Sequence, residues 1–303
     1  MRLWVVASSD RYDGGYSILR EQYRQLSSLG RPLDPKYPSN LFILIFATAG
    51  FIAFFVFKLL GGEPALGSLG YGVRSALAIF LAWALGRELD PDYPLSANVS
   101  AVGSAIWVGW HGVPSLLLAV WALFVFRIVS RSTGKRATTL DAGLLMMVTG
   151  VGVWFGHHSF WILAVMTSGA FCGDAVLSNP ARKQLFPGAI MALFTAVFLF
   201  LNPLEIPHLN DTLPFYGAAL GTALSFTVVI YDSGKINSVA DLGASTLSSA
   251  RIRFTQVLAL LAALFFALWA GQRGLHISAI LWLVIAAATS VHLFGKVLST
   301  YRR

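Results

Sequence analysis

The sequence is poor in charged residues and nearly free of cysteine. Asp, Glu, Lys and Arg make up 12% of its 303 residues, against about 25% in an average soluble domain. Hydrophobic residues make up 56%, and the mean hydropathy is +0.68. The single Cys172 excludes an intramolecular disulfide. This composition predicts a protein embedded in a lipid bilayer rather than one with a large soluble core.

Several motifs that would identify an enzyme are also missing. The chain contains no Walker A, H-E-x-x-H, G-x-S-x-G, C-x-x-C or G-x-G-x-x-G pattern. The apolar segments hold no clear carboxylate, lysine or histidine at mid-depth, which is the usual mark of an ion-coupled path. The first apolar run, within residues 1–10, is too short for the core of a signal peptide.

A short motif occurs twice. Residues 31–38 read R-P-L-D-P-K-Y-P, residues 87–94 read R-E-L-D-P-D-Y-P, and an apolar run follows each copy. Asp-Pro and Tyr-Pro favour extended backbone, and a proline is well tolerated at the first position of a helix. Each copy therefore predicts the start of a membrane helix, with Ser39 or Asn40 and Ser96 as candidate caps. The repetition also suggests that the first two helical hairpins are parallel copies of one unit.

Ten apolar segments predict an all-α, polytopic bundle of about ten transmembrane helices, with eight as the lower bound. They cover residues 41–60, 69–85, 95–109, 114–130, 140–155, 160–177, 187–202, 214–231, 254–271 and 277–297. Residues 95–109 and 114–130 are short and closely spaced, so a re-entrant hairpin remains an alternative to two full spans. Residues 41–297 would form the transmembrane domain, preceded by a polar arm (1–40) and followed by a short tail (298–303).

Basic residues predict the orientation. If every segment crosses, all but three of the 22 Lys and Arg fall on the side of the N-terminus, the exceptions being Lys58, Arg74 and Arg273. Because basic residues concentrate in the cytoplasm, both termini are expected there. Tyr16, Leu19, Tyr23 and Leu26 follow helical spacing, which predicts an amphipathic helix on the membrane surface, or else a regulatory or partner-binding arm.

The predicted cytoplasmic loops hold the candidate site residues. Asp90 and Asp92 could hold a divalent cation such as Mg²⁺ against a phosphate. The first copy of the motif, however, has Lys36 in place of Asp92 and so lacks the acid pair. The residues that both copies share are therefore expected to have a structural role. Asp174 is expected to be partly buried, with Arg182 or Lys183 as its partner. The candidate catalytic residues are therefore Asp174, Asp90 and Asp92. The candidate substrate-binding residues are Arg87, Arg136, Ser178, Arg182, Lys183 and Lys235.

One run resembles a family signature. Gly173-Asp174-x-x-x-Ser178 with Arg182 and Lys183 is similar to the G-D-x-x-x-S-x-x-K-R pattern of CDP-diacylglycerol synthases, whose acidic and basic residues work with metal on CTP and phosphatidate. The basic pair lies one position late, and the family's downstream Lys-Asp and Pro-Gly-His-Gly-Gly elements are missing. The resemblance is confined to residues 173–183 and identifies no family.

Three functions remain open after these observations. The first is an enzyme that handles a lipid phosphate at the cytoplasmic interface, with Mg²⁺ as a cofactor to be considered. The second is a permease for a small or lipidic solute without ion coupling, and the third is a membrane scaffold or assembly protein. We expect a location in the cell (cytoplasmic) membrane, contact with the lipid bilayer and no nucleic-acid partner. A homo-oligomer and a membrane partner chain are both open.

Histidines are expected to gather on the outer face. Five of the six fall at predicted outer loops or segment ends, together with an aromatic belt that includes Trp107, Trp161 and Trp269. A metal site from these histidines is one reading, and ordinary interfacial imidazoles are the other. The five are His111, His157, His158, His208 and His276.

Overall fold

The protein is all-helical. The computed structural model describes residues 27–301 apart from residues 32, 157, 203–212 and 242–244, is 80% helical, and has no strand among these residues. The predicted arm helix around residues 16–26 lies outside the described residues. The helices are α2 (Pro38–Leu60), α3 (Ala65–Leu89), α4 (Pro94–His111), α5 (Leu116–Ser130), α6 (Thr139–Phe155), η1 (His158–Phe160), α7 (Trp161–Val176), η2 (Arg182–Gln184), α8 (Leu185–Leu201), α9 (Leu213–Asp232), α10 (Ser249–Ile277) and α11 (Ala279–Tyr301).

Four helical stretches are long and apolar enough to cross a membrane. They are Pro38–Leu60, Ala65–Leu89, Arg182–Leu201 and Ser249–Ile277. In α2 only Asn40 and Ile43 are buried, while Phe57 is 66% exposed. On α8, Phe200 is 86% exposed. A soluble helix would bury an apolar stripe, so these all-round apolar surfaces indicate contact with lipid.

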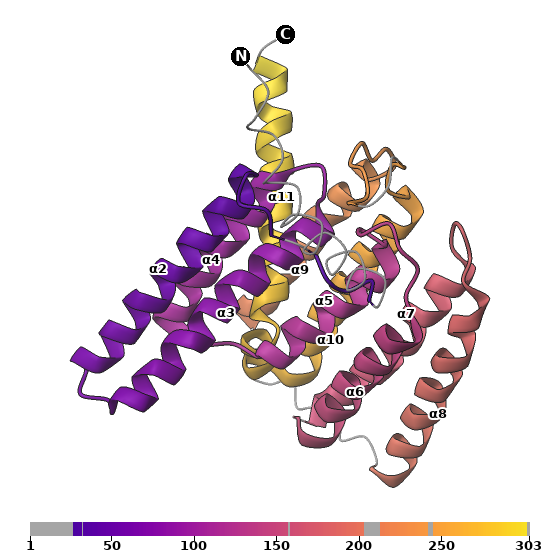
Figure 1. Cartoon of the computed structure of the whole chain (residues 1–303), viewed down its shortest axis with the longest axis horizontal. Coiled ribbons are helices and arrows are strands. Elements are labelled where there is room, and N and C mark those ends of the chain that lie inside the picture. Colours follow the sequence, from indigo (N-terminus) through magenta and orange to yellow (C-terminus); the bar gives the residue numbers. More distant parts are fainter. Residues whose placement is uncertain (1–26, 32, 157, 203–212, 242–244, 302–303) are drawn as a thin grey trace, which may run out of the picture.

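The helices pack in a continuous bundle. Figure 1 shows α2, α3 and α4 on one side, α6, α7 and α8 on the other, and α5 and α10 between them. Helix α3 packs against α2, α4, α5 and α11, whereas α8 packs chiefly against α7. The largest side chains in the core are Trp121, Phe126, Phe171, Phe226 and Phe266, each almost fully buried.

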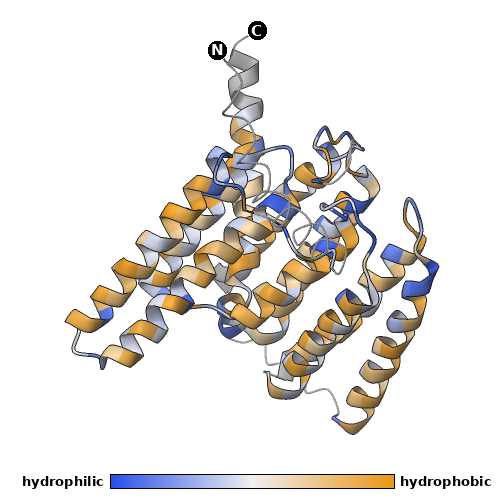
Figure 2. Cartoon of the chain, in the orientation of Figure 1, coloured by the Kyte–Doolittle hydropathy of each residue, from blue (hydrophilic) through white to orange (hydrophobic). Residues whose placement is uncertain are grey.

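Every second connection between consecutive helices lies at the same end of the bundle. Residues 27–31, 33–37, 90–93, 131–138, 177–184, 233–241 and 245–248 make up what we call the polar end. There the Asp241 amide donates to the Ser132 carbonyl at 3.1 Å, and the Ser178 and Ser248 hydroxyls are 2.6 Å apart. The turns around residues 61–64, 112–115 and 278 lie at the opposite end (Figure 1). Figure 2 shows hydrophilic residues concentrated at the polar end and apolar residues along the helices.

The two copies of the repeated motif form the same turn. In each copy the amide of the tyrosine donates to the carbonyl of the aspartate three residues before it, Tyr37 to Asp34 at 3.1 Å and Tyr93 to Asp90 at 3.3 Å. As predicted, each helix then begins on its proline, Pro38 or Pro94. The predicted caps were wrong, because Tyr37 and Tyr93 occupy the N-cap positions without a side-chain bond. The amides at the third helical position, those of Asn40 and Ser96, donate instead to the backbone carbonyls of Tyr37 and Tyr93, each at 3.0 Å.

Helices α3 and α10 extend past their apolar segments into charged residues. Helix α3 continues past residue 85 to Leu89, and α10 begins at Ser249 rather than near residue 254. The added turns carry Glu88 and Arg251, both buried and both paired with opposite charges. A prediction from hydropathy ends an apolar segment at a charged residue. The helix itself can continue when that residue is paired with an opposite charge inside the bundle.

Candidate functional site

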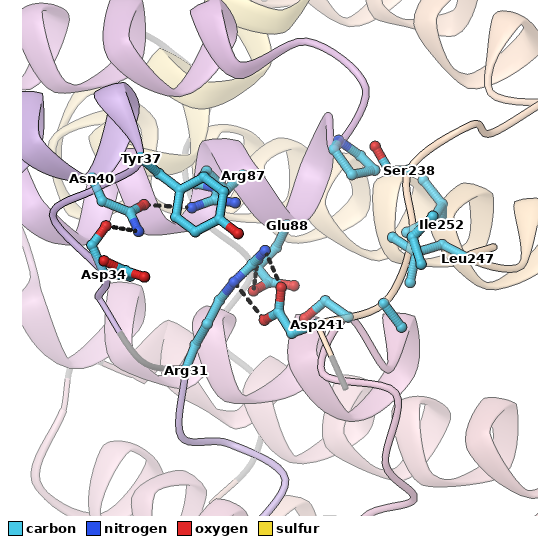
Figure 3. A pocket seen from close by; sticks show the side chains of 14 residues that line it. Arg31, Asp34, Tyr37, Asn40, Arg87, Glu88, Ser238, Asp241, Leu247 and Ile252 are labelled. Carbon is cyan, nitrogen blue, oxygen red and sulfur yellow. Dashed lines mark hydrogen bonds and ion pairs between the residues drawn. The ribbon is translucent and has the colours of Figure 1, made fainter. Parts of the chain in front are cut away.

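A pocket of about 440 Å³ opens at the polar end between the two copies of the motif. The first copy contributes Arg31, Asp34 and Tyr37, and the second contributes Arg87, Glu88 and Pro91. In Figure 3 the Arg31, Asp34, Tyr37 and Arg87 side chains lie on one side of the pocket, across from Ser238, Leu247 and Ile252. Asn40, Ser132, Val239, Ala240 and Asp241 complete the lining. We call this cavity the polar-end pocket.

The motif copies interlock around the pocket through their arginines. Arg31 of the first copy reaches Glu88 in the second, with Nη1 and Oε1 3.6 Å apart. Arg87 of the second copy donates to the Asn40 side-chain oxygen, just after the first copy, at 2.7 Å (Figure 3). The equivalent arginines therefore cross over, Arg31 from the loop before α2 and Arg87 from α3, which ties the start of α2 to the end of α3.

The acidic groups of the pocket are mostly neutralised by arginine. Arg31 binds Asp241 through two nitrogens, at 2.7 and 2.8 Å. The fully buried Glu88 also accepts from Arg127 at 3.1 Å and from Ser130 at 3.2 Å. A buried carboxylate requires such partners, because an unpaired buried charge is very costly.

Arg87 differs from the other arginines around the pocket. Its polar partner is the neutral amide of Asn40, and its guanidinium lies 5.3 Å from the centre of the Trp83 ring. Among the described residues Arg87 has no direct ion pair, although Asp241 and Glu88 act on its charge from further away. A guanidinium that lacks a carboxylate and faces a pocket can bind a phosphate or carboxylate through its remaining donors.

Asp90 and Asp92 do not form an acid pair. Asp90 accepts from Ser96 and lies 3.1 Å from Nε2 of the buried His292, whose ring is tilted against that of Tyr93 with centres 4.4 Å apart. Asp92 instead accepts from the amides of Asn237 at 2.9 Å and Ser238 at 2.8 Å. The two carboxylates are thus directed to α11 and to the α9–α10 loop respectively, so they do not fit a shared divalent cation.

Asp92 has a lowered pKa. Its partial burial would raise the pKa of the carboxyl group, but the hydrogen bonds donated by Ser238 and Asn237 outweigh burial and hold the pKa below its usual value. Asp92 therefore stays ionised at neutral pH and fastens the α9–α10 loop to the turn between α3 and α4.

Asp174 is fully buried between two arginines. Its Oδ1 accepts from Arg131 and from Arg251, each at 2.7 Å. The predicted partners Arg182 and Lys183 are exposed instead. Arg131 and Arg251 come from the ends of two other helices, α5 and α10, so sequence proximity could not reveal them. Their remaining nitrogens donate to carbonyls, such as that of Ser178 at 2.8 Å.

The other predicted residues lie outside the polar-end pocket. Arg136 is exposed and binds the Asn179 side chain, and Ser178 bonds with Ser248. Arg182, Lys183 and Lys235 are exposed on the polar end. Of the nine predicted site residues, only Arg87 lines the pocket. Arg31, Asp34, Glu88 and Asp241 were missed, although Arg31 and Asp34 repeat Arg87 and Asp90 in the duplicated motif.

A metal site finds no support in the described residues, because no group of three or more His, Cys, Asp or Glu among them could hold an ion. Of the histidines predicted for the outer face, His111 and His276 both lie beside Trp107, with ring centres 4.3 and 6.0 Å away. The His158 side chain, His157 and His208 fall outside the description.

Comparisons with known proteins assign no family. The chain matches no protein-family model, and no curated protein and no solved structure is significantly similar to it.

Proposed function

We propose that this chain is a multi-pass protein of the cytoplasmic membrane that binds the anionic headgroup of a lipid phosphate in its polar-end pocket. The observation that carries this proposal is Arg87, a guanidinium that lines the pocket without a carboxylate partner among the described residues. Arg31 stands nearby but is already neutralised by Asp241 and Glu88.

The position of the pocket favours a lipid headgroup. The pocket is lined from the first residues of α2 and the last residues of α3, where the apolar surface of these helices gives way to polar loops. In a bilayer, this boundary lies at the depth of lipid phosphates. The exposed ring of Tyr37, 65% accessible at the rim, suits the same interfacial layer.

The proposal includes ten membrane crossings with both termini in the cytoplasm. Alternate helix connections lie at opposite ends of the bundle, and the polar end carries the arginine clusters, as expected of a cytoplasmic face. Reporter fusions at Gly62 and Asn210 should both report an external location, and one at Lys235 a cytoplasmic location. A cytoplasmic signal at Gly62 would contradict this topology.

If the protein is an enzyme, Asp34 is the best-placed base. Glu88 and Asp241 are each bound by arginine, whereas the Asp34 carboxylate accepts only from the Lys36 amide among the described residues, at 3.0 Å. A carboxylate with free lone pairs beside a bound phosphate could accept a proton from an attacking hydroxyl or water. Arg87 would hold the phosphate and stabilise its charge.

The test compares lipid binding by matched variants. The protein is placed in phosphatidylcholine nanodiscs with a minor fraction of phosphatidic acid, and retained lipid is measured by native mass spectrometry. Arg87→Gln should lower phosphatidic acid retention about tenfold or more, since a charge-assisted bond is lost. Lys235→Gln, an exposed charge at the same end outside the pocket, should retain it. Equal retention by wild type and Arg87→Gln would overturn the proposal.

A further inference from the structure

A second and larger pocket lies at the opposite end of the bundle. It has a volume of about 850 Å³ and is walled by α4, α9, α10 and α11. It shares no lining residue with the polar-end pocket. From its lining we infer that this opposite-end pocket binds an amphipathic anion, a molecule with a carboxylate or phosphate head and an apolar body.

A break in α10 shapes the pocket. Gly271 has φ 55° and ψ −134°, a left-handed conformation that a residue with a side chain rarely adopts, so the helix changes direction there. The residues that follow the break, among them Gln272, Arg273 and His276, line the pocket. A straight continuation of α10 would direct them elsewhere.

The walls of the pocket suit an apolar body. Trp107 lies on one side, stacked on His111 at 4.3 Å and close to His276 at 6.0 Å. Alanines of α9 and α11, such as Ala218 and Ala286, make room opposite the rings. Flat rings facing small side chains leave space for an aliphatic chain or an aromatic ring.

The charged side chain among the described residues that line the pocket is positive. Arg273 is exposed and has no ion-pair or hydrogen-bond partner among the described residues. No acidic side chain is among the described residues that line the pocket. Gln272 and Thr222 supply neutral donors. A cation at an apolar pocket whose described lining carries no acid is complementary to an amphipathic anion, and not to a cation or a neutral sugar.

Such an anion could come from the membrane or from water, and two probes distinguish these sources. Protein in phosphatidylcholine nanodiscs is titrated with 12-bromododecanoate, which reaches the pocket from the membrane, or with 4-bromobenzoate, which reaches it from water. Bromine quenches nearby tryptophan fluorescence, and Trp107 and Trp282 both line the pocket. We expect saturable quenching by at least one of the two, and much weaker quenching by the uncharged 12-bromododecanol.

Matched variants decide whether the pocket is responsible. Arg273→Gln should weaken the apparent affinity about ten- to hundredfold, as expected for loss of a charge-assisted bond. Arg74→Gln, an exposed arginine of α3 outside the pocket, should leave it unchanged. Ala218→Phe adds a ring to an exposed wall residue and should abolish saturable quenching without unfolding the protein.

Tryptophan variants locate the bound probe. Trp107→Phe and Trp282→Phe should each reduce the quenched fraction, whereas Trp161→Phe, in the Phe265–Trp269 cluster outside the pocket, should not. The inference is overturned if neither carboxylate quenches saturably, if the alcohol quenches equally well, or if Arg273→Gln behaves as wild type. Because Arg87 is intact in all of these variants, failure here leaves the proposed lipid-phosphate site untouched.

Discussion

Two buried carboxylates at the polar end are each held by two arginines, yet their surroundings differ. Asp174 is enclosed by Arg131 and Arg251, whose other nitrogens bind backbone carbonyls. Glu88 is bound by Arg31 and Arg127 but borders a pocket that also contains Arg87. A buried ion pair therefore does not by itself mark a functional site. An adjoining cavity with a further charge is what separates Glu88 from Asp174.

The largest effect is expected at Asp174. Asp174→Ala leaves Arg131 and Arg251 buried without a counter-charge, which should cost about 3–5 kcal/mol of stability. Thermal unfolding in mild detergent measures the loss, and Arg182→Ala, an exposed neighbour, is the control. An unfolding temperature close to wild type would show that the enclosed pair is not structural.

Glu88→Gln should be less damaging, because Arg31 keeps Asp241 and the freed Arg127 keeps its bond to the Leu29 carbonyl. A loss of about 1–3 kcal/mol is expected, together with stronger binding of anionic lipid, since one negative charge leaves the pocket. Unfolding and native mass spectrometry on the same sample report the two effects. If Glu88→Gln loses as much stability as Asp174→Ala, the distinction between the two clusters fails.

Asp241→Asn removes a partly exposed ion pair with Arg31. Exposed and partly exposed pairs contribute about 0–1 kcal/mol, so unfolding should change little. Arg31 would then be less neutralised, and phosphatidic acid retention should rise or stay constant in the nanodisc assay. A fall in retention would instead place Asp241 among the groups that bind the ligand.

The smallest effect is a pH dependence from Asp92. Because the pKa of Asp92 is lowered in the folded protein, its stabilising contribution is present above the unfolded pKa of about 3.9 and is lost as pH falls through the folded value. Asp92→Asn should remove this part of the acid dependence of unfolding. The control is Lys36→Asp, which adds an acid at the equivalent position of the first motif copy without this loop contact. An unchanged pH profile in Asp92→Asn would contradict the assignment.

Local features were the part that sequence could predict. The first-position prolines of α2 and α4 follow from backbone rules alone. The start of α6 likewise depends on residues close in sequence, since Thr138 and Asp141 form a capping box. These features depend on residues within one helical turn of one another, and for that reason they can be predicted from the sequence.

The site residues were predicted poorly because they come from distant segments. Asp174 meets Arg131 and Arg251, which are 43 and 77 positions away in the chain. His292 approaches Asp90 from 202 positions away. No spacing rule links such residues, and any of several loop cations could have paired with Asp174.

The sequence by itself determined that the chain is helical, apolar and suited to a membrane, because hydropathy and helix-start signals act over a few residues. The sequence also shows the duplicated motif, but it does not show what the two copies do. Only the tertiary structure decided that the two copies face one another across a pocket, that Glu88 and Asp241 neutralise Arg31, and that Arg87 has no direct carboxylate partner among the described residues. Charge pairing depends on distances of a few ångströms between helices, and only the packed bundle sets those distances.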